Sequence, residues 1–108
     1  MKEDLLKIIN HYGLANQLKY IHSEYYELDE AILHYENSKC FNDEYGVDDN
    51  KHIIEELSDC FVMLKQLQYY YGIEDSEIKK IMREKIDRQL NRIEDEKAGW
   101  EFINKGEE

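Results

Sequence analysis

Proline is absent from the 108 residues of the chain, and glycine occurs only five times. Without proline to break helices, and with little glycine to allow sharp turns, the chain favours long uninterrupted helices over sandwiches or barrels. Apolar residues make up 42% of the chain and charged residues 36%. This composition suits amphipathic helices that bury one face. We therefore expect an all-α protein.

Basic residues are also scarce: 14 lysines and arginines stand against 25 aspartates and glutamates, which gives a net charge of −11. So acidic a surface repels polyanions. We therefore expect neither polymeric nucleic acid nor a membrane as partner, although a small metal-complexed anion stays compatible. No apolar run approaches the roughly 20 residues that span a bilayer. Cys40 and Cys60 form no CxxC motif and are interpreted as free thiols in a reducing cytoplasm.

The length fits one domain, residues 1–108, in which residues 98–108 can fray as a tail. Helical spacing predicts a short first helix that ends at Gly13, and three longer helices. The second has an apolar seam with alternating four-three spacing, the third runs from about residue 50 to Gly72, and the fourth from about residue 75 to Ala98–Gly99. The seam of the second helix consists of Leu14, Leu18, Ile21, Tyr25, Leu28, Ile32 and Tyr35.

The expected fold is therefore a four-helix bundle-type subunit. Because so small a subunit would leave apolar flanks exposed, we expect a homodimer or homotetramer. A polar loop from about residue 38 to 50 joins the second and third helices, and the sequence leaves open whether it covers a site.

Two pairs of carboxylates stand three residues apart, Glu24/Glu27 and Glu56/Asp59. Residues three apart on a helix lie roughly 60° from each other, so each pair shares a face. Both pairs belong to stripes beside the apolar seams, and these stripes can meet if the two helices pack antiparallel through their seams. The stripes are Gln17, Tyr20, Glu24, Glu27 and Ala31 on one helix, and His52, Glu56, Asp59 and Met63 on the other.

Four carboxylates packed together repel one another, whereas a hard divalent cation lets all of them stay ionised. The pairs therefore predict a Mg²⁺ site, with Mn²⁺ as the alternative ion. The competing interpretation is that acids flank seams in many bundles and pair there with lysine or arginine. A di-iron bundle normally uses Glu-x-x-His motifs, and no histidine stands three after a glutamate of the proposed site. The four histidines are interpreted as surface or seam residues.

Three stretches carry a family resemblance. In this order, over about residues 5–93, they resemble the MazG-type all-α nucleoside triphosphate pyrophosphohydrolases, especially their small phage-like branch. The stretches are residues 12–28, which end in Ser23-Glu24-Tyr25-Tyr26-Glu27-Leu28, then Glu55-Glu56-Leu57-Ser58-Asp59-Cys60, and finally Lys85-Ile86-Asp87-Arg88-Gln89-Leu90-Asn91-Arg92.

The resemblance implies a helical bundle, dimeric or a dimer of dimers, that hydrolyses (d)NTP to (d)NMP and pyrophosphate with Mg²⁺. It implies that the metal ligands are Glu24, Glu27, Glu56 and Asp59, of which Glu27 and Glu56 are the expected catalytic residues. By the same analogy Gln17 and Lys19 meet a base or phosphate. On the fourth helix Lys85, Arg88 and Arg92 share one flank, where they can hold phosphate oxygens or form ordinary surface ion pairs.

The chain departs from the family pattern at Ser23, where members often have a further glutamate. A hydroxyl cannot act as a carboxylate base at neutral pH. Three alternatives therefore stay open: an enzyme in which the metal and a ligand carboxylate such as Glu27 suffice, a nucleotide- or metal-binding module with little or no turnover, and a non-catalytic helical scaffold.

Overall fold

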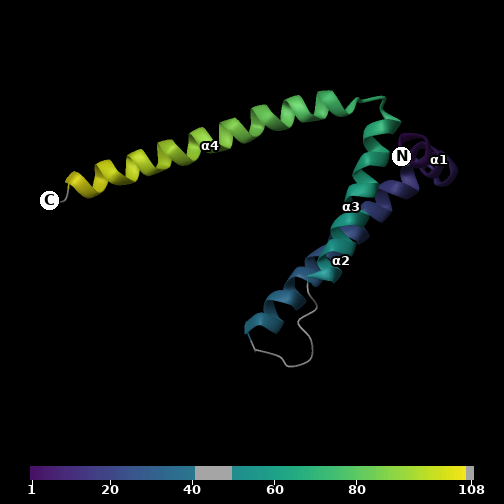
Figure 1. Cartoon of the computed structure of the whole chain (residues 1–108), viewed down its shortest axis with the longest axis horizontal. Coiled ribbons are helices and arrows are strands. Elements are labelled where there is room, and N and C mark those ends of the chain that lie inside the picture. Colours follow the sequence, from purple (N-terminus) through teal and green to yellow (C-terminus); the bar gives the residue numbers. More distant parts are fainter. Residues whose placement is uncertain (41–49, 107–108) are drawn as a thin grey trace. The chain divides into compact units, whose positions relative to one another are not determined.

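The computed structural model describes residues 1–40 and 50–106, and of Cys40 and residues 101–106 only the backbone. Over these ranges the chain forms four α-helices and no strand (Figure 1). The helices are α1 (Lys2–Tyr12), α2 (Leu14–Cys40), α3 (Lys51–Tyr70) and α4 (Asp75–Gly106). The predicted all-α class, with a short first helix and three longer ones, is confirmed.

The chain divides into two compact units, Met1–Gly72 with α1 to α3 and Ile73–Glu108 with α4. The expectations of a single domain and of a four-helix bundle within one subunit stay predictions. None of the helices in the described ranges is both long and apolar enough to traverse a bilayer.

The helix ends follow local chemistry. Gly13 ends α1 with φ 90°, and its N–H donates to the Ile9 carbonyl over 2.8 Å. Gly72, with φ 69°, follows α3. These positive φ angles suit glycine because it has no Cβ to clash. At the start of α4 the Glu74 N–H donates to the Glu77 carboxylate over 2.8 Å, which satisfies a backbone donor that the helix leaves unpaired.

Two predicted boundaries were wrong. The second helix continues to Cys40, where residues 37–39 were expected to begin a loop. Within this extension the Ser38 hydroxyl donates to the His34 carbonyl over 2.9 Å. The fourth helix runs through Ala98–Gly99 to Gly106, because a single glycine costs a helix interior only about 1 kcal/mol. The rest of the expected loop, residues 41–49, lies outside the described residues.

In the first unit α2 and α3 lie side by side and run in opposite directions, and α1 packs against both (Figure 1). Leu5 and Ile9 of α1 are buried, Ile9 completely. Between α2 and α3 the buried side chains are Gln17, Ala31, Glu56, Met63 and Gln66. Most of these are polar.

The stripes were expected to meet if the helices packed through their apolar seams, but three of the seven seam residues of α2 are exposed. Leu18, Tyr25 and Ile32 are 43%, 71% and 40% exposed. The buried face of α2 is turned by roughly 60° from the middle of the seam, toward the stripe that carries Glu24 and Ala31. The stripes thus meet directly, and part of each helix's apolar surface stays on the outside.

In the second unit α4 is amphipathic. Among the residues of α4 whose side chains are described, all the large apolar ones are exposed, and several recur on one side at helical spacing. These are Ile78, Met82, Ile86, Leu90 and Ile93.

Candidate metal centre

The register between α2 and α3 follows from a buried amide pair. The Gln17 side chain donates from Nε2 to Oε1 of Gln66 over 2.8 Å, and the two residues are 5% and 2% exposed. Because α2 and α3 run antiparallel, a step of ten residues from Gln17 along α2 corresponds to a step of ten residues back from Gln66 along α3. These steps place Glu27 opposite Glu56. A second contact agrees, because the Cys60 thiol donates to the Glu24 carbonyl over 3.5 Å.

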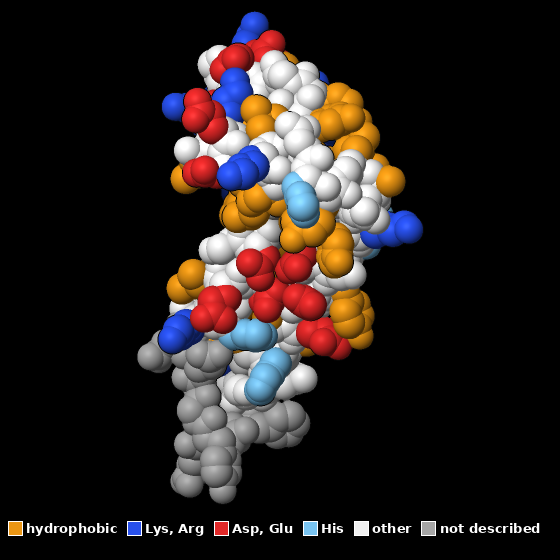
Figure 2. Space-filling view, turned by 90° about the vertical axis from the view of Figure 1, so that its right-hand side faces the viewer, with side chains coloured by type: hydrophobic (Ala, Val, Ile, Leu, Met, Phe, Trp, Pro, Cys, Tyr) orange, Lys and Arg blue, Asp and Glu red, His pale blue; other side chains and the backbone are white. Residues whose placement is uncertain are grey.

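Three carboxylates come together at this point. Glu24, Glu27 and Glu56 each offer an oxygen, and the three oxygens lie within 4.8 Å of one another. Glu56 is buried, Glu24 half-buried and Glu27 exposed. In the space-filling view acidic side chains gather in one patch, with histidines beside it and hydrophobic side chains on its flanks (Figure 2).

Two oxygens of this cluster lack a partner. Oε2 of Glu24 and Oε2 of Glu56 are buried and accept no hydrogen bond. Among the described residues the cluster's one ion pair joins Glu56 Oε1 to His52 Nε2 at 3.9 Å. Buried carboxylate oxygens are normally hydrogen-bonded or bound to a cation. The competing interpretation of the acids, pairing with lysine or arginine, has no support in these contacts.

The pKa values of Glu24 and Glu56 are both raised above their ordinary value. Burial is the main cause that raises the pKa of Glu24 above its ordinary value, followed by the charges of Glu27, Asp59 and Glu56. Burial and then the charges of Glu27 and Asp59 raise the pKa of Glu56, while His52 acts in the opposite direction. Burial and the neighbouring negative charges thus both disfavour the ionised forms of Glu24 and Glu56. A divalent cation would offset the contribution of the neighbouring charges.

Asp59, the fourth expected ligand, lies outside the group of three, although its charge acts on both Glu24 and Glu56. It is exposed, near the edge of the cluster. All donors in the cluster are carboxylate oxygens, the ligands that Mg²⁺ and Mn²⁺ prefer. The residues present therefore fit a hard divalent ion, with Glu24, Glu27 and Glu56 as its closest donors.

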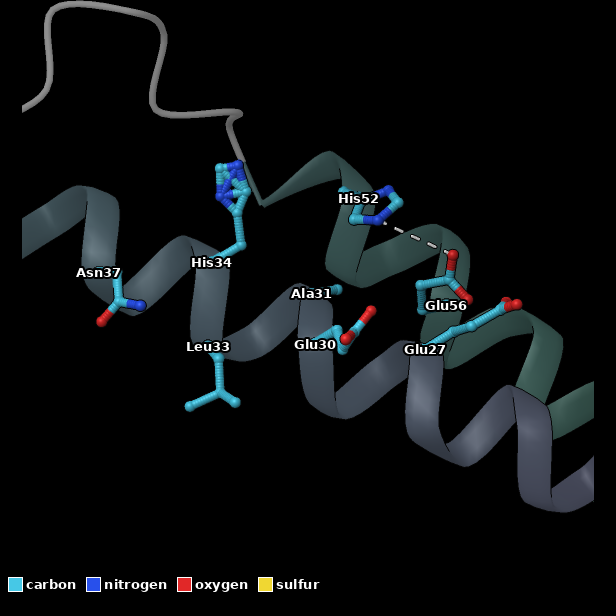
Figure 3. A pocket seen from close by; sticks show the side chains of 8 residues that line it. All are labelled: Glu27, Glu30, Ala31, Leu33, His34, Asn37, His52 and Glu56. Atoms are coloured by element: carbon cyan, nitrogen blue, oxygen red, sulfur yellow. Dashed lines mark ion pairs between the residues drawn. The ribbon is translucent and has the colours of Figure 1, made fainter.

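Depressions lie on both sides of the carboxylates. The first, of about 780 Å³, is bounded by Glu27 and Glu56 and extends along α2 past His34 (Figure 3). The second, of about 240 Å³, is lined by Tyr12, Gln17, Tyr20, Glu24 and Met63. The cluster thus separates a polar depression with two histidines from a smaller one with two tyrosines and a glutamine amide.

Of the two expected substrate-binding residues on α2, Gln17 lines a depression beside the carboxylates and Lys19 does not. Gln17 lines the smaller depression, and its amide is already engaged with Gln66. Lys19 is exposed on α2 and lines none of the described depressions. The basic residues Lys85, Arg88 and Arg92 belong to α4, in the second unit, so their role stays a prediction.

Ser23 is exposed beside the cluster and brings no carboxylate to it. Glu55, the neighbour of Glu56, lies 3.9 Å from His52, measured from Oε2 to Nδ1, and is not one of the three clustered acids.

Sequence reasoning missed three residues. His34 and His52 were interpreted as surface or seam residues; both are indeed exposed, and both also line the larger depression beside Glu27 and Glu56. Their spacing carried the signal, because His34 stands seven after Glu27 and His52 four before Glu56, on the same helix faces. Gln66 had a weaker signal, as an amide within the apolar run of α3.

Comparisons of the chain with protein-family models, with curated proteins and with solved structures gave no match. The resemblance to the MazG-type enzymes therefore stays an expectation.

Proposed function

We propose that the chain is a Mg²⁺-dependent nucleoside triphosphate pyrophosphohydrolase that converts (d)NTP and water to (d)NMP and pyrophosphate. The observation that carries this proposal is the group of three carboxylates from two helices, whose oxygens lie within 4.8 Å of one another. Two buried oxygens of this group lack any partner. A site with this donor set suits hard cations, and Mg²⁺ is the usual partner of nucleotide phosphates.

Bound there, Mg²⁺ would neutralise phosphate charge and make an attacking water more acidic. Glu24, Glu27 and Glu56 would hold the ion from two helices, and Asp59 would add negative charge from the edge. Glu27 is the most exposed of the three, so its second oxygen can orient a water and accept its proton. Glu56 is buried, which suits a fixed ligand more than a mobile base.

Tyr12 and Tyr20 line the smaller depression, and their rings can stack on a nucleobase. Gln17 lines the same depression, but its Nε2 is engaged with Gln66, so its proposed contact to a base edge falls to the amide groups that this bond leaves over. On α4, Lys85, Arg88 and Arg92 are the proposed cationic contacts to phosphate, and Lys19 is a further one on α2.

A second candidate function is a binding module of the same fold that holds Mg²⁺ and nucleotide without efficient turnover. Ser23 favours it, because this exposed hydroxyl supplies no carboxylate base beside the cluster.

One experiment separates these functions. The purified chain is incubated with Mg²⁺ and a panel of NTPs and dNTPs, with pyrophosphate release and the melting temperature as parallel readouts. The enzyme releases pyrophosphate, and Glu24→Gln abolishes the release. The binding module shows nucleotide-dependent stabilisation without product. If neither readout responds, the acids belong to a helical scaffold and both proposals fail.

We further propose that the chain acts as a homodimer or homotetramer. Large apolar side chains stay exposed on α2 and α3, and burying them between copies would supply hydrophobic free energy. They include Leu18, Tyr25, Ile32, Leu57 and Phe61. Sedimentation velocity should give a mass of at least twice 13.1 kDa, and Phe61→Glu should lower it. A monomer over the whole accessible concentration range contradicts this assembly.

A further inference from the structure

The depression beyond the carboxylates has an unusual lining for a phosphate site. Its eight lining residues include three glutamates, two histidines and one asparagine, and none of the eight is a lysine or arginine. The acidic end is formed by Glu27, Glu30 and Glu56, and the hydrogen-bond donors of His34 and Asn37 lie further along α2. An anion can enter only if a cation compensates the acids, and it then meets imidazole and amide donors beyond them.

We propose that this depression binds the distal phosphates of a Mg²⁺-complexed polyphosphate chain, with His34 as the N–H donor to the terminal phosphate. This proposal rests on the proposed function, since it assigns the leaving pyrophosphate of the triphosphate to this depression. It adds a binding residue that discriminates substrates by the length of their phosphate chain.

The helix geometry supports this assignment. Glu27, Ala31 and His34 stand at i, i+4 and i+7, so they follow one another along a single face of α2. Seven residues correspond to about 10 Å along the helix axis. Such a separation suits a chain of phosphates that starts at the carboxylate-bound cation, and it exceeds what one phosphate ion bridges.

The small residue between them keeps the path open. Ala31 is 3% exposed and separates Glu27 from His34 without a side chain that would fill the depression. In Figure 3 the Glu27 and Glu56 carboxylates turn toward one another, and His34 of α2 lies on the same side as His52 of α3. His52 is already shared between Glu55 and Glu56, with 3.9 Å to each. His34 takes part in neither of these ion pairs.

An independent feature points to a cation at the acidic end. Glu56 is only 9% exposed, lines this depression, and has one buried oxygen without any partner. A polyphosphate without metal would face three carboxylates and be repelled. Binding should therefore require Mg²⁺, and it should strengthen as the chain becomes long enough to reach His34.

The test uses inorganic probes, so it needs no turnover. Isothermal titration measures the binding of orthophosphate, pyrophosphate and tripolyphosphate, each with Mg²⁺ and again with EDTA. We expect affinity to rise with chain length in Mg²⁺ and to vanish in EDTA. His34→Ala should weaken tripolyphosphate binding about tenfold, the usual effect of one lost hydrogen bond to a charged group, and change orthophosphate binding little. His34→Gln, which keeps an N–H donor, should restore part of the loss.

The matched control is His22→Ala, which removes an exposed imidazole from α2 about 140° round the helix from Glu27. It should bind tripolyphosphate as the wild type does. Circular dichroism of each variant confirms that the helices are intact. Equal binding by the wild type and His34→Ala overturns the inference, as does binding that persists in EDTA or no binding of any polyphosphate.

A parallel assay of NTP hydrolysis keeps the two proposals apart. If the wild type releases pyrophosphate from NTP and His34→Ala leaves KM unchanged, the proposed function stands and this inference fails. If tripolyphosphate binding depends on Mg²⁺ and His34 but no NTP is hydrolysed, the inference stands and the hydrolysis proposal fails.

Discussion

Neutralising Glu24 offers the most direct test of the carboxylate cluster. Glu24→Gln keeps the shape of the side chain and removes one of three charges whose oxygens lie within 4.8 Å. At this separation, with a water-like dielectric and salt screening, the repulsion relieved is on the order of 1 kcal/mol. The new amide can also donate to a neighbouring carboxylate. We therefore expect the metal-free variant to be more stable than the wild type, with a melting temperature higher by about 4–8 °C.

In Mg²⁺ the order should reverse. At a Mg²⁺ concentration of about 100 times Kd, binding stabilises the wild type by about 2.7 kcal/mol, whereas Glu24→Gln has lost a ligand and should respond little. Thermal melts followed by circular dichroism, with Mg²⁺ and with EDTA, measure both effects. Asp29→Asn is the control, because it removes a charge from the same helix about 140° round from Glu24. A variant that is less stable than the wild type in EDTA and equally stabilised by Mg²⁺ would refute the reasoning.

Three further predictions concern the same unit. Because the pKa values of Glu24 and Glu56 are raised in the folded chain, their contribution to stability is complete below the unfolded pKa and is lost as pH rises through the folded pKa. The metal-free melting temperature should thus fall as the pH rises above the ordinary glutamate pKa of about 4.3, and it should fall less in a double Gln variant, which pH-dependent melts can check. Gln66→Leu leaves the buried Gln17 amide unpaired and should lower the free energy of unfolding in urea by about 1–3 kcal/mol. Adding Gln17→Leu removes the unpaired amide and should recover much of this loss; an equal loss in the single and the double variant would exclude this cause. Ser23→Glu should raise the kcat of NTP hydrolysis if the missing carboxylate limits turnover, and an unchanged kcat would show that the present residues suffice.

The helices and the stripes were predictable because both depend on local spacing. The absence of proline predicted long helices, and the positions of Gly13 and Gly72 predicted where α1 and α3 end. The carboxylates were found because residues three apart share a helix face, whatever the helix packs against.

The choice of packing face was harder to predict, because it depends on the partner. The apolar seam is wide enough to serve two neighbours, and hydrophobicity alone does not say which part faces α3. Exposure of Leu18 and Tyr25 shows that α3 takes the polar side of α2. The sequence did not place His34 and His52 in one depression for the same reason, since this depression becomes visible only once the two stripes are known to face each other.

The buried Gln17–Gln66 hydrogen bond has a consequence for how the site is encoded. If α2 slid past α3 by one turn, both amides would lose their partner inside the contact, at a cost of about 1–3 kcal/mol each. Two uncharged side chains, ten residues from Glu27 and Glu56, thus fix the register between α2 and α3. A single buried asparagine fixes the register of a coiled coil in the same way. The ionised carboxylates of Glu24, Glu27 and Glu56 repel one another, so their closeness depends on contacts elsewhere between the two helices, such as this hydrogen bond.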